Sequence, residues 1–255
     1  GWYERFWKKT NGNFEASHPE YFSKGPGDKP PQLCYSNPAV IAQAVKDARD
    51  YFDHGGYRVD YCGTHKGYEW GEDTFALSPM DGGGFCQCPA CAKQYEPARA
   101  KDAAEFSTYW FTFVNAVARE VKKTHPDKMI MTSAYAAFEG LPTNVRLEDN
   151  VIVDFALSAN RTPASPLLRK QMDRMRQWRN AYPRAKIQMW LYNCFPKLIA
   201  DNAGFQCFPG YCVHEAQKQF DFFREIDAMS GIFYDGFDGD VEGYVHLKLL
   251  LDPAR

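Results

Sequence analysis

Residues 213–236, VHEAQKQFDFFREIDAMSGIFYDG, predict a helix followed directly by a buried strand. From residue 213 to residue 229, apolar residues recur every three or four positions, as they do on one face of a helix. Residues 230–236 then form a short apolar run rather than a strict alternation of apolar and polar residues. Such runs are typical of parallel strands that helices cover on both faces.

The same rhythm extends outward through the chain. Apolar strand patterns alternate with helix patterns, and one of these helices begins after Ser36 or Asn37 with Pro38 in its first turn. The strands are predicted at 74–80, 128–135, 150–158, 185–193 and 230–236, and the helices at 36–56, 101–128, 166–182, 213–229 and 241–251.

This alternation predicts an α/β fold of the (β/α)8 TIM-barrel type. An eight-stranded barrel usually takes about 250 residues, and the 255 residues here show about five strands among long loops. We therefore expect residues 1–255 to form a single barrel-type domain that is incomplete at its N-terminus. A dinucleotide-binding fold is disfavoured, because the sequence has no Gly-x-Gly-x-x-Gly turn.

Composition argues against two classes of partner. The net charge is −2 and the isoelectric point is near 6.3, so bulk electrostatics favour neither nucleic acid nor an anionic membrane surface. No apolar run approaches the roughly 20 residues of a membrane-spanning helix, so we expect no membrane insertion. The chain begins at Gly1 without a visible signal peptide, and its localisation cannot be derived from this end.

Polar and aromatic residues gather where the predicted strands end. In a parallel barrel, these ends form the active site. Carboxylates there can serve as acid, base or nucleophile, and aromatic rings can stack on sugars. Turn formation and core packing are the alternative roles of these residues. The candidates near these ends are Asp81, Tyr135, Trp190, Tyr192, Asn193, Tyr234 and Asp235. Asp154, in the middle of the strand predicted at 150–158, and His18, in a loop, are further candidate substrate contacts.

Three cysteines follow the first predicted strand within six residues. Cys86, Cys88 and Cys91 form Cys-x-Cys-x-x-Cys, and three thiolates this close can converge on one zinc ion. Cys34 or Cys62 would supply the fourth ligand of a structural site. The alternative is a set of disulfides, which would suit an extracytoplasmic protein.

Several blocks, read in order, resemble one bacterial family. They are HPEYF (18–22), QLCYSNPAVI (32–41), FALSPMDGGGFCQCPAC (75–91), FVNAVAREVKKTHPDK (113–128) and GIFYDGFDGDVEGYVHLKLLLDP (231–253). The series resembles domain-of-unknown-function family 4838, some of whose members belong to glycoside hydrolase family 163, endo-β-N-acetylglucosaminidases acting on N-glycans.

The resemblance implies a (β/α)8-type catalytic domain, a carbohydrate substrate and an extracytoplasmic location, periplasmic or secreted. Asp81 stands at the acidic position of the family's Asn-Asp-Gly type motif, where Met80 replaces the usual Asn. Asp235 stands where a Glu or Gln is expected.

We therefore expect a glycoside hydrolase that cleaves a β-linked, N-acetylated sugar without a catalytic cofactor. Asp81 would be an acid/base or would polarise the substrate acetamido group, and Asp235 would be its partner carboxylate. Trp190, Tyr192 and Tyr234 would form the sugar platform. Two alternatives are a non-catalytic carbohydrate-binding barrel and a zinc-dependent hydrolase that uses Cys34, Cys86, Cys88 and Cys91.

Overall fold

The computed structural model describes most of the chain as two compact units, Gly1–Ile152 and Val153–Arg255. The described residues are 2, 6, 14–25, 32–56, 71–80, 83–157, 166–193, 213–236 and 240–251; for 192–193, 213–215, 233–236 and 240–242 only the backbone is described.

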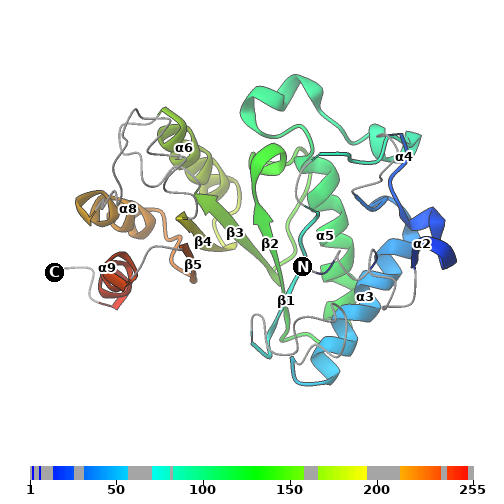
Figure 1. Ribbon diagram of the computed structural model, residues 1–255, viewed down its shortest axis with the longest axis horizontal. Coiled ribbons are helices and arrows are strands. Elements are labelled where there is room, and N and C mark those ends of the chain that lie inside the picture. Colours follow the sequence, from blue (N-terminus) through cyan, green and yellow to red (C-terminus); the bar gives the residue numbers. More distant parts are fainter. Residues whose placement is uncertain are drawn as a thin grey trace. The chain divides into compact units, whose positions relative to one another are not determined.

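The first unit packs helices against a parallel strand pair (Figure 1). Its elements are α2 (Phe14–Ser17), the 3-10 helix η1 (Pro19–Tyr21), α3 (Pro38–Asp53), β1 (Thr74–Ala76), α4 (Pro89–Ala92), η2 (Pro97–Asp102), α5 (Ser107–Lys122), β2 (Met129–Ala134), η3 (Ala136–Phe138) and the start of β3 (Val151–Leu157).

Helix α3 begins where the sequence predicts. The Asn37 side chain accepts a hydrogen bond of 2.9 Å from the backbone N–H of Ala39, and Pro38 occupies the first turn. This cap satisfies one of the N–H groups that a helix start leaves without an intrahelical acceptor. The face carrying Val40, Ala44 and Ala48 is fully buried.

Helix α5 provides the aromatic core of the first unit. Its Trp110 ring packs edge-on against Tyr35 at 4.9 Å between centroids, and Phe113 lies 4.9 Å from the same tyrosine. The indole N–H of Trp110 donates to the Thr132 hydroxyl on β2 at 2.9 Å. This hydrogen bond satisfies the indole N–H, whose burial without an acceptor would be unfavourable. Helix α5 is thereby fixed against the sheet.

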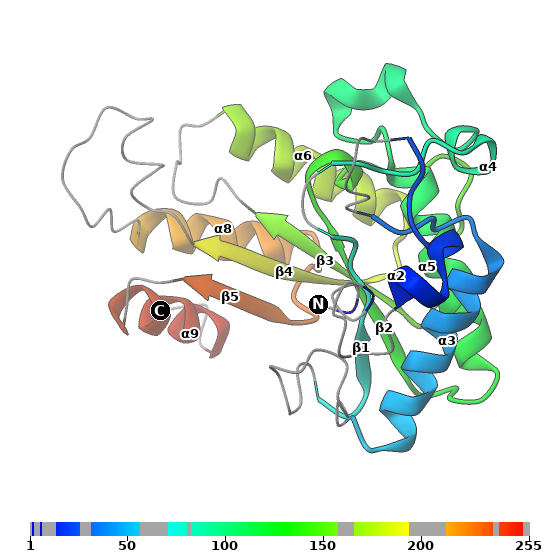
Figure 2. The same ribbon diagram turned by 45° about the vertical axis from the view of Figure 1, so that its right-hand side comes forward.

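The second unit repeats the strand–helix alternation. Its elements are the rest of β3, α6 (Pro166–Ala181), β4 (Lys186–Asn193), α8 (Val213–Glu225), β5 (Ile232–Gly236) and α9 (Asp240–Leu251). Strands β4 and β5 lie side by side and run parallel, with Met189 opposite Ile232 (Figure 2). Helix α8 lies between them in the chain, in agreement with the crossover connection that a parallel pair requires.

The two faces of β4 differ in burial. Ile187, Met189 and Leu191 are fully buried, whereas Gln188 and Trp190 on the opposite face are half-buried. Neighbouring residues of a strand point to opposite faces, so one face of β4 belongs to the core and the other offers polar groups.

Strands β1 and β2 are neighbours in the first unit, and β3, β4 and β5 follow one another in this order in the second. The predicted α/β class with parallel strand pairing is confirmed, while closure into an eight-stranded barrel stays a prediction. Among the described helices, none is both long enough and apolar enough to cross a membrane.

The predicted bounds of two elements are wrong. The helix expected at 101–128 is α5 over Ser107–Lys122 alone, preceded by η2 and by Ala103 in a left-handed conformation with φ 53°. The strand expected at 74–80 is paired only over Thr74–Ala76, although the N–H of Leu77 still donates to the carbonyl of Met131 at 2.8 Å.

Candidate functional site

The segment after β1 is held by a buried glutamine. Gln32 is fully buried, and its amide donates to the carbonyl of Met80 at 2.5 Å and accepts from the N–H of Met80 at 3.1 Å. The hydroxyl of Tyr35 donates to the same amide oxygen at 2.8 Å. Gln32 therefore fixes the residue before candidate Asp81, which itself lies outside the described residues. Nothing in the Pro-rich sequence around Gln32 indicates this role.

Four cysteine thiols converge beside this segment. The Sγ atoms of Cys34, Cys86, Cys88 and Cys91 all lie within 4.8 Å of one another, and all four thiols are free. Cys34 Sγ lies 3.8 Å from Cys88 Sγ and 3.6 Å from Cys91 Sγ. Three of the four residues are buried and Cys88 is half-buried. Of the two fourth members suggested by sequence, the structure places Cys34 in the cluster, while Cys62 lies outside the described residues.

The surroundings of the cluster favour a thiolate. Hydrogen bonds from the Cys34 and Cys91 thiols lower the pKa of Cys86, and the backbone N–H groups of Cys88 and Lys24 act in the same direction. The same bond to Cys86 raises the pKa of Cys34. A negative sulfur is thus stabilised by its neighbours, as a metal-ligating cysteine requires.

Aromatic rings close the cluster from the side of α5. The Tyr109 hydroxyl lies 3.2 Å from Cys91 Sγ and accepts from the N–H of Tyr35 at 2.9 Å. Tyr95 packs on Tyr109 at 5.2 Å between centroids. Burial, and next the contact with Cys91, raise the pKa of Tyr109, so its hydroxyl keeps its proton.

A second polar arrangement lies on one face of β3 and β4 in the second unit. Asp154 is 4% exposed, and the Gln188 amide donates to its carboxyl oxygen at 3.2 Å. Burial raises the pKa of Asp154 to about 7, because the charged form loses hydration, while the Gln188 hydrogen bond partly opposes this shift. Trp190, two positions along β4, shares this face. We call Asp154, Gln188 and Trp190 the polar face.

The register of β4 and β5 brings two further candidate positions together. Tyr192 is paired with Asp235, and Leu191 with Tyr234, at the ends of the two parallel strands. Asn193 is the last residue of β4. The side chains of Tyr192, Asn193, Tyr234 and Asp235 lie outside the described part of the structure, so their roles as sugar contacts or catalysts stay predictions.

Two other predicted contacts lie in the first unit. His18 stacks on Tyr21 at 4.5 Å between centroids, and its Nδ1 is 3.1 Å from Glu20. Tyr135 directly follows β2 and is half-buried at the start of η3.

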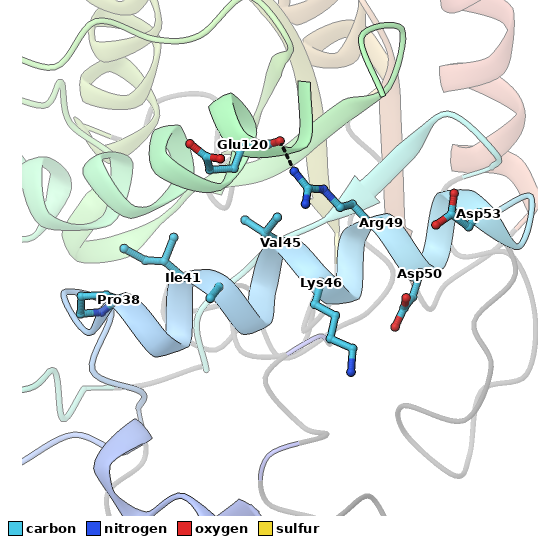
Figure 3. A pocket seen from close by; sticks show the side chains of 9 residues that line it. Pro38, Ile41, Val45, Lys46, Arg49, Asp50, Asp53 and Glu120 are labelled. Atoms are coloured by element: carbon cyan, nitrogen blue, oxygen red, sulfur yellow. Dashed lines mark hydrogen bonds between the residues drawn. The ribbon is translucent and has the colours of Figure 1, made fainter. Parts of the chain in front are cut away.

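A shallow hollow of about 530 Å³ lies between α3 and α5 (Figure 3). Ile41 and Val45 form its apolar part, and Arg49 spans it to donate to the carbonyl of Glu120 at 2.6 Å. None of its described lining residues is a predicted site residue. The hydrogen bond that Arg49 makes between the two helices is sufficient to explain the charge of Arg49 in this hollow.

The sequence profile of the family described as Domain of unknown function (DUF4838) matches residues 3–255. The chain belongs to this family. The resemblance inferred from the motifs is thereby confirmed at the family level. Among curated proteins, none matches this DUF4838 chain.

Two solved structures are similar to the DUF4838 chain. Both are endo-glycoceramidase II from Rhodococcus sp., one in a five-membered iminocyclitol complex and one in a cellobiose-like imidazole complex. The TM-scores are 0.43 and 0.45, with 10% sequence identity over 80% of this chain. The chain spans 42% of the length of these proteins.

Proposed function

We propose that this DUF4838 chain is a barrel-type glycoside hydrolase domain that cleaves a β-linked, N-acetylated sugar. The observation that carries the proposal is the buried carboxyl of Asp154, with a pKa of about 7, on a sheet face that also holds an amide and an indole. A carboxyl group that stays protonated at neutral pH can donate a hydrogen bond to a sugar oxygen, and burial is the usual means of producing one.

The proposed roles divide among three carboxyl groups. Asp81 and Asp235 form the acid/base pair, one protonating the leaving oxygen and the other acting as nucleophile or base, or orienting an acetamido group that does so. Asp154, in its neutral form, donates a hydrogen bond to a sugar oxygen, with Gln188 holding its second oxygen in place.

Aromatic side chains supply the sugar platform in this proposal. Trp190 is half-buried on the polar face, and Tyr192 and Tyr234 lie at the paired ends of β4 and β5. Asn193, Tyr135 and His18 remain proposed substrate contacts. The sugar itself is the only partner that the proposal requires, and no catalytic cofactor enters it.

Hydrolysis of chromogenic β-N-acetylglucosaminides and of glycoprotein N-glycans tests the proposal. We expect Asp81→Asn and Asp235→Asn to lose roughly 100-fold or more in kcat, the range typical of a removed acid or base. Asp173→Asn, on the exposed face of α6, is the matched control and should leave the rate unchanged.

Asp154→Asn gives a sharper readout. Because the protonated form of Asp154 is the active one, kcat/KM of the wild type should fall as the pH rises through about 7. The Asn variant cannot ionise, so this alkaline limb should disappear. Glycan binding without turnover in the wild type, or equal rates in all variants, would refute the catalytic proposal.

A further inference from the structure

We propose that Cys34, Cys86, Cys88 and Cys91 bind one structural zinc ion, which fixes the loop between β1 and α4. The inference rests on the positions of the four sulfurs. A tetrahedral zinc with bonds of about 2.3 Å separates any two of its sulfur ligands by about 3.8 Å. The distances from Cys34 Sγ to Cys88 Sγ and to Cys91 Sγ, 3.8 Å and 3.6 Å, agree with this spacing.

Disulfides do not account for the same geometry. A disulfide brings two sulfurs to about 2.05 Å, whereas all four thiols here are free and Cys34 is nearly equidistant from Cys88 and Cys91. Without a cation, three buried thiols and one half-buried thiol in mutual contact would each be poorly solvated. One divalent cation at their centre supplies the common partner.

The local backbone is arranged for thiolate ligands. Cys88 precedes α4, and the N–H groups of Cys91 and Ala92 donate to its carbonyl at 3.0 and 2.9 Å, which folds the Cys-Pro-Ala-Cys turn tightly. The N–H of Lys24 points at Cys86 Sγ at 3.3 Å. Such N–H donors offset the negative charge of a tetrathiolate site.

Tyr109 completes the surroundings of the metal. Its oxygen already accepts from the N–H of Tyr35, so its own proton is available for a second bond. When Cys91 is a zinc-bound thiolate, the Tyr109 hydroxyl donates to Cys91 Sγ across the observed 3.2 Å. Partners of this kind orient metal ligands and contribute to metal affinity.

Four thiolates fill every coordination position of a tetrahedral zinc. Catalytic zinc keeps one position open for water or substrate, so the geometry assigns a structural role and argues against the zinc-dependent hydrolase. The metal joins the turn at Cys34 to Cys86 and α4. Gln32, two residues before Cys34, holds Met80. The loop from Met80 to Cys86 is therefore fixed at both ends.

This arrangement has a consequence for catalysis that rests on the proposed function. Asp81 lies within the loop from Met80 to Cys86, so loss of zinc should lower glycosidase activity through its position. The zinc site itself is tested without any activity measurement, and the two proposals can therefore fail independently.

Metal analysis and X-ray absorption of the full chain, purified under reducing conditions, test the site directly. We expect about one zinc per chain with four sulfur ligands at about 2.3 Å. Substitution by Co²⁺ should give the intense visible absorption of a tetrahedral tetrathiolate. Zinc-free protein, iron in place of zinc, or a metal shell containing nitrogen or oxygen ligands would overturn the assignment.

Variants then assign the ligands. Cys91→Ser should lose most of the bound zinc and lower Tm by roughly 10 °C or more, as removal of a structural metal does. Ala92→Ser, an exposed neighbour on α4, is the matched control and should retain one zinc. Tyr109→Phe, which keeps the ring, should weaken zinc affinity roughly 10–100-fold. A Cys91→Ser protein with full zinc content would refute the site even if other variants fail to fold.

Discussion

Replacing Asp154 by Asn should stabilise the protein at alkaline pH. The native carboxyl has a pKa of about 7, against an ordinary value of 3.8, because burial penalises its charged form. In the unfolded chain the same group ionises freely above pH 3.8. Between these two values the native state binds more protons than the unfolded state, so the free energy of unfolding falls as the pH rises. Asn has nearly the same shape and no charge.

The difference of about 3 pKa units corresponds to about 4 kcal/mol at pH values above 7, using 1.36 kcal/mol for each unit. Asp154 is 4% exposed, so solvent screening does not reduce this figure appreciably. Over the accessible interval from pH 5 to pH 8, the same two pKa values predict that the variant gains about 3 kcal/mol relative to the wild type.

Urea unfolding of the two proteins at pH 5, 6, 7 and 8 measures this gain. Subtracting the two free energies cancels every other titrating group, so the difference isolates Asp154. Asp173→Asn on the surface of α6 should show a difference that does not change with pH. A constant difference for Asp154→Asn, or a wild type that gains on the variant as the pH rises, would refute the assignment of a neutral buried carboxyl.

Two further substitutions test how the candidate site is held in place. Gln32→Leu removes both hydrogen bonds to the backbone of Met80 and should lower the free energy of unfolding by about 3–5 kcal/mol. Gln94→Leu, whose amide is partly exposed, is the control and should lower it by less than about 1 kcal/mol. Similar urea midpoints for the two variants would contradict the proposed role of Gln32. In Gly231→Ala the added Cβ would lie 3.0 Å from the amide oxygen of Gln188, which should weaken the hydrogen bond from Gln188 to Asp154, raise the pKa of Asp154 and extend the fall in stability to higher pH. Gly83→Ala, with open space around its Cβ, is the control and should leave the pH dependence of stability unchanged. Identical pH profiles for the two variants would contradict this coupling.

The strand–helix alternation could be predicted from sequence because parallel strands are buried on both sides. Their apolar runs stand out against the 3.6-residue spacing of the helices, and α6, predicted at 166–182, ends within one residue of that range. The start of α3 was equally accessible, since Asn37 and Pro38 act within the helix that they begin. Local signals of this kind need no knowledge of distant contacts.

The bounds of β1 and α5 depend on distant contacts and could not be predicted. After Ala76 the pattern still resembles a strand, but at Met80 the side chain of Gln32 supplies the hydrogen bonds that a neighbouring strand would have made. Before α5, the carbonyl of Ala103 accepts from the N–H of Gly140 at 2.7 Å. A Cβ at Gly140 would lie 2.6 Å from the Asp102 carbonyl oxygen, so this close approach requires glycine.

The candidate site shows the same division between local and distant signals. Cys86, Cys88 and Cys91 are close in sequence, and their spacing alone indicated convergence. The choice of Cys34 as the fourth member required the fold, because Cys34 lies 52 positions before Cys86 and the intervening chain carries no signal for the contact.

For Asp154 the position was predictable from the sequence, but the role was not. Its position amid apolar residues of a strand was visible in the sequence, but a buried structural carboxylate and a functional acid have the same pattern there. The distinction comes from the partner. A structural carboxylate that stays ionised needs a cation or several N–H donors, whereas within the described part of the chain the hydrogen-bond partner of Asp154 is the neutral amide of Gln188. Such a partner leaves desolvation dominant, and a carboxyl protonated near neutral pH follows. This group costs the protein stability at alkaline pH, and that cost is the reason to expect that it serves catalysis or sugar binding.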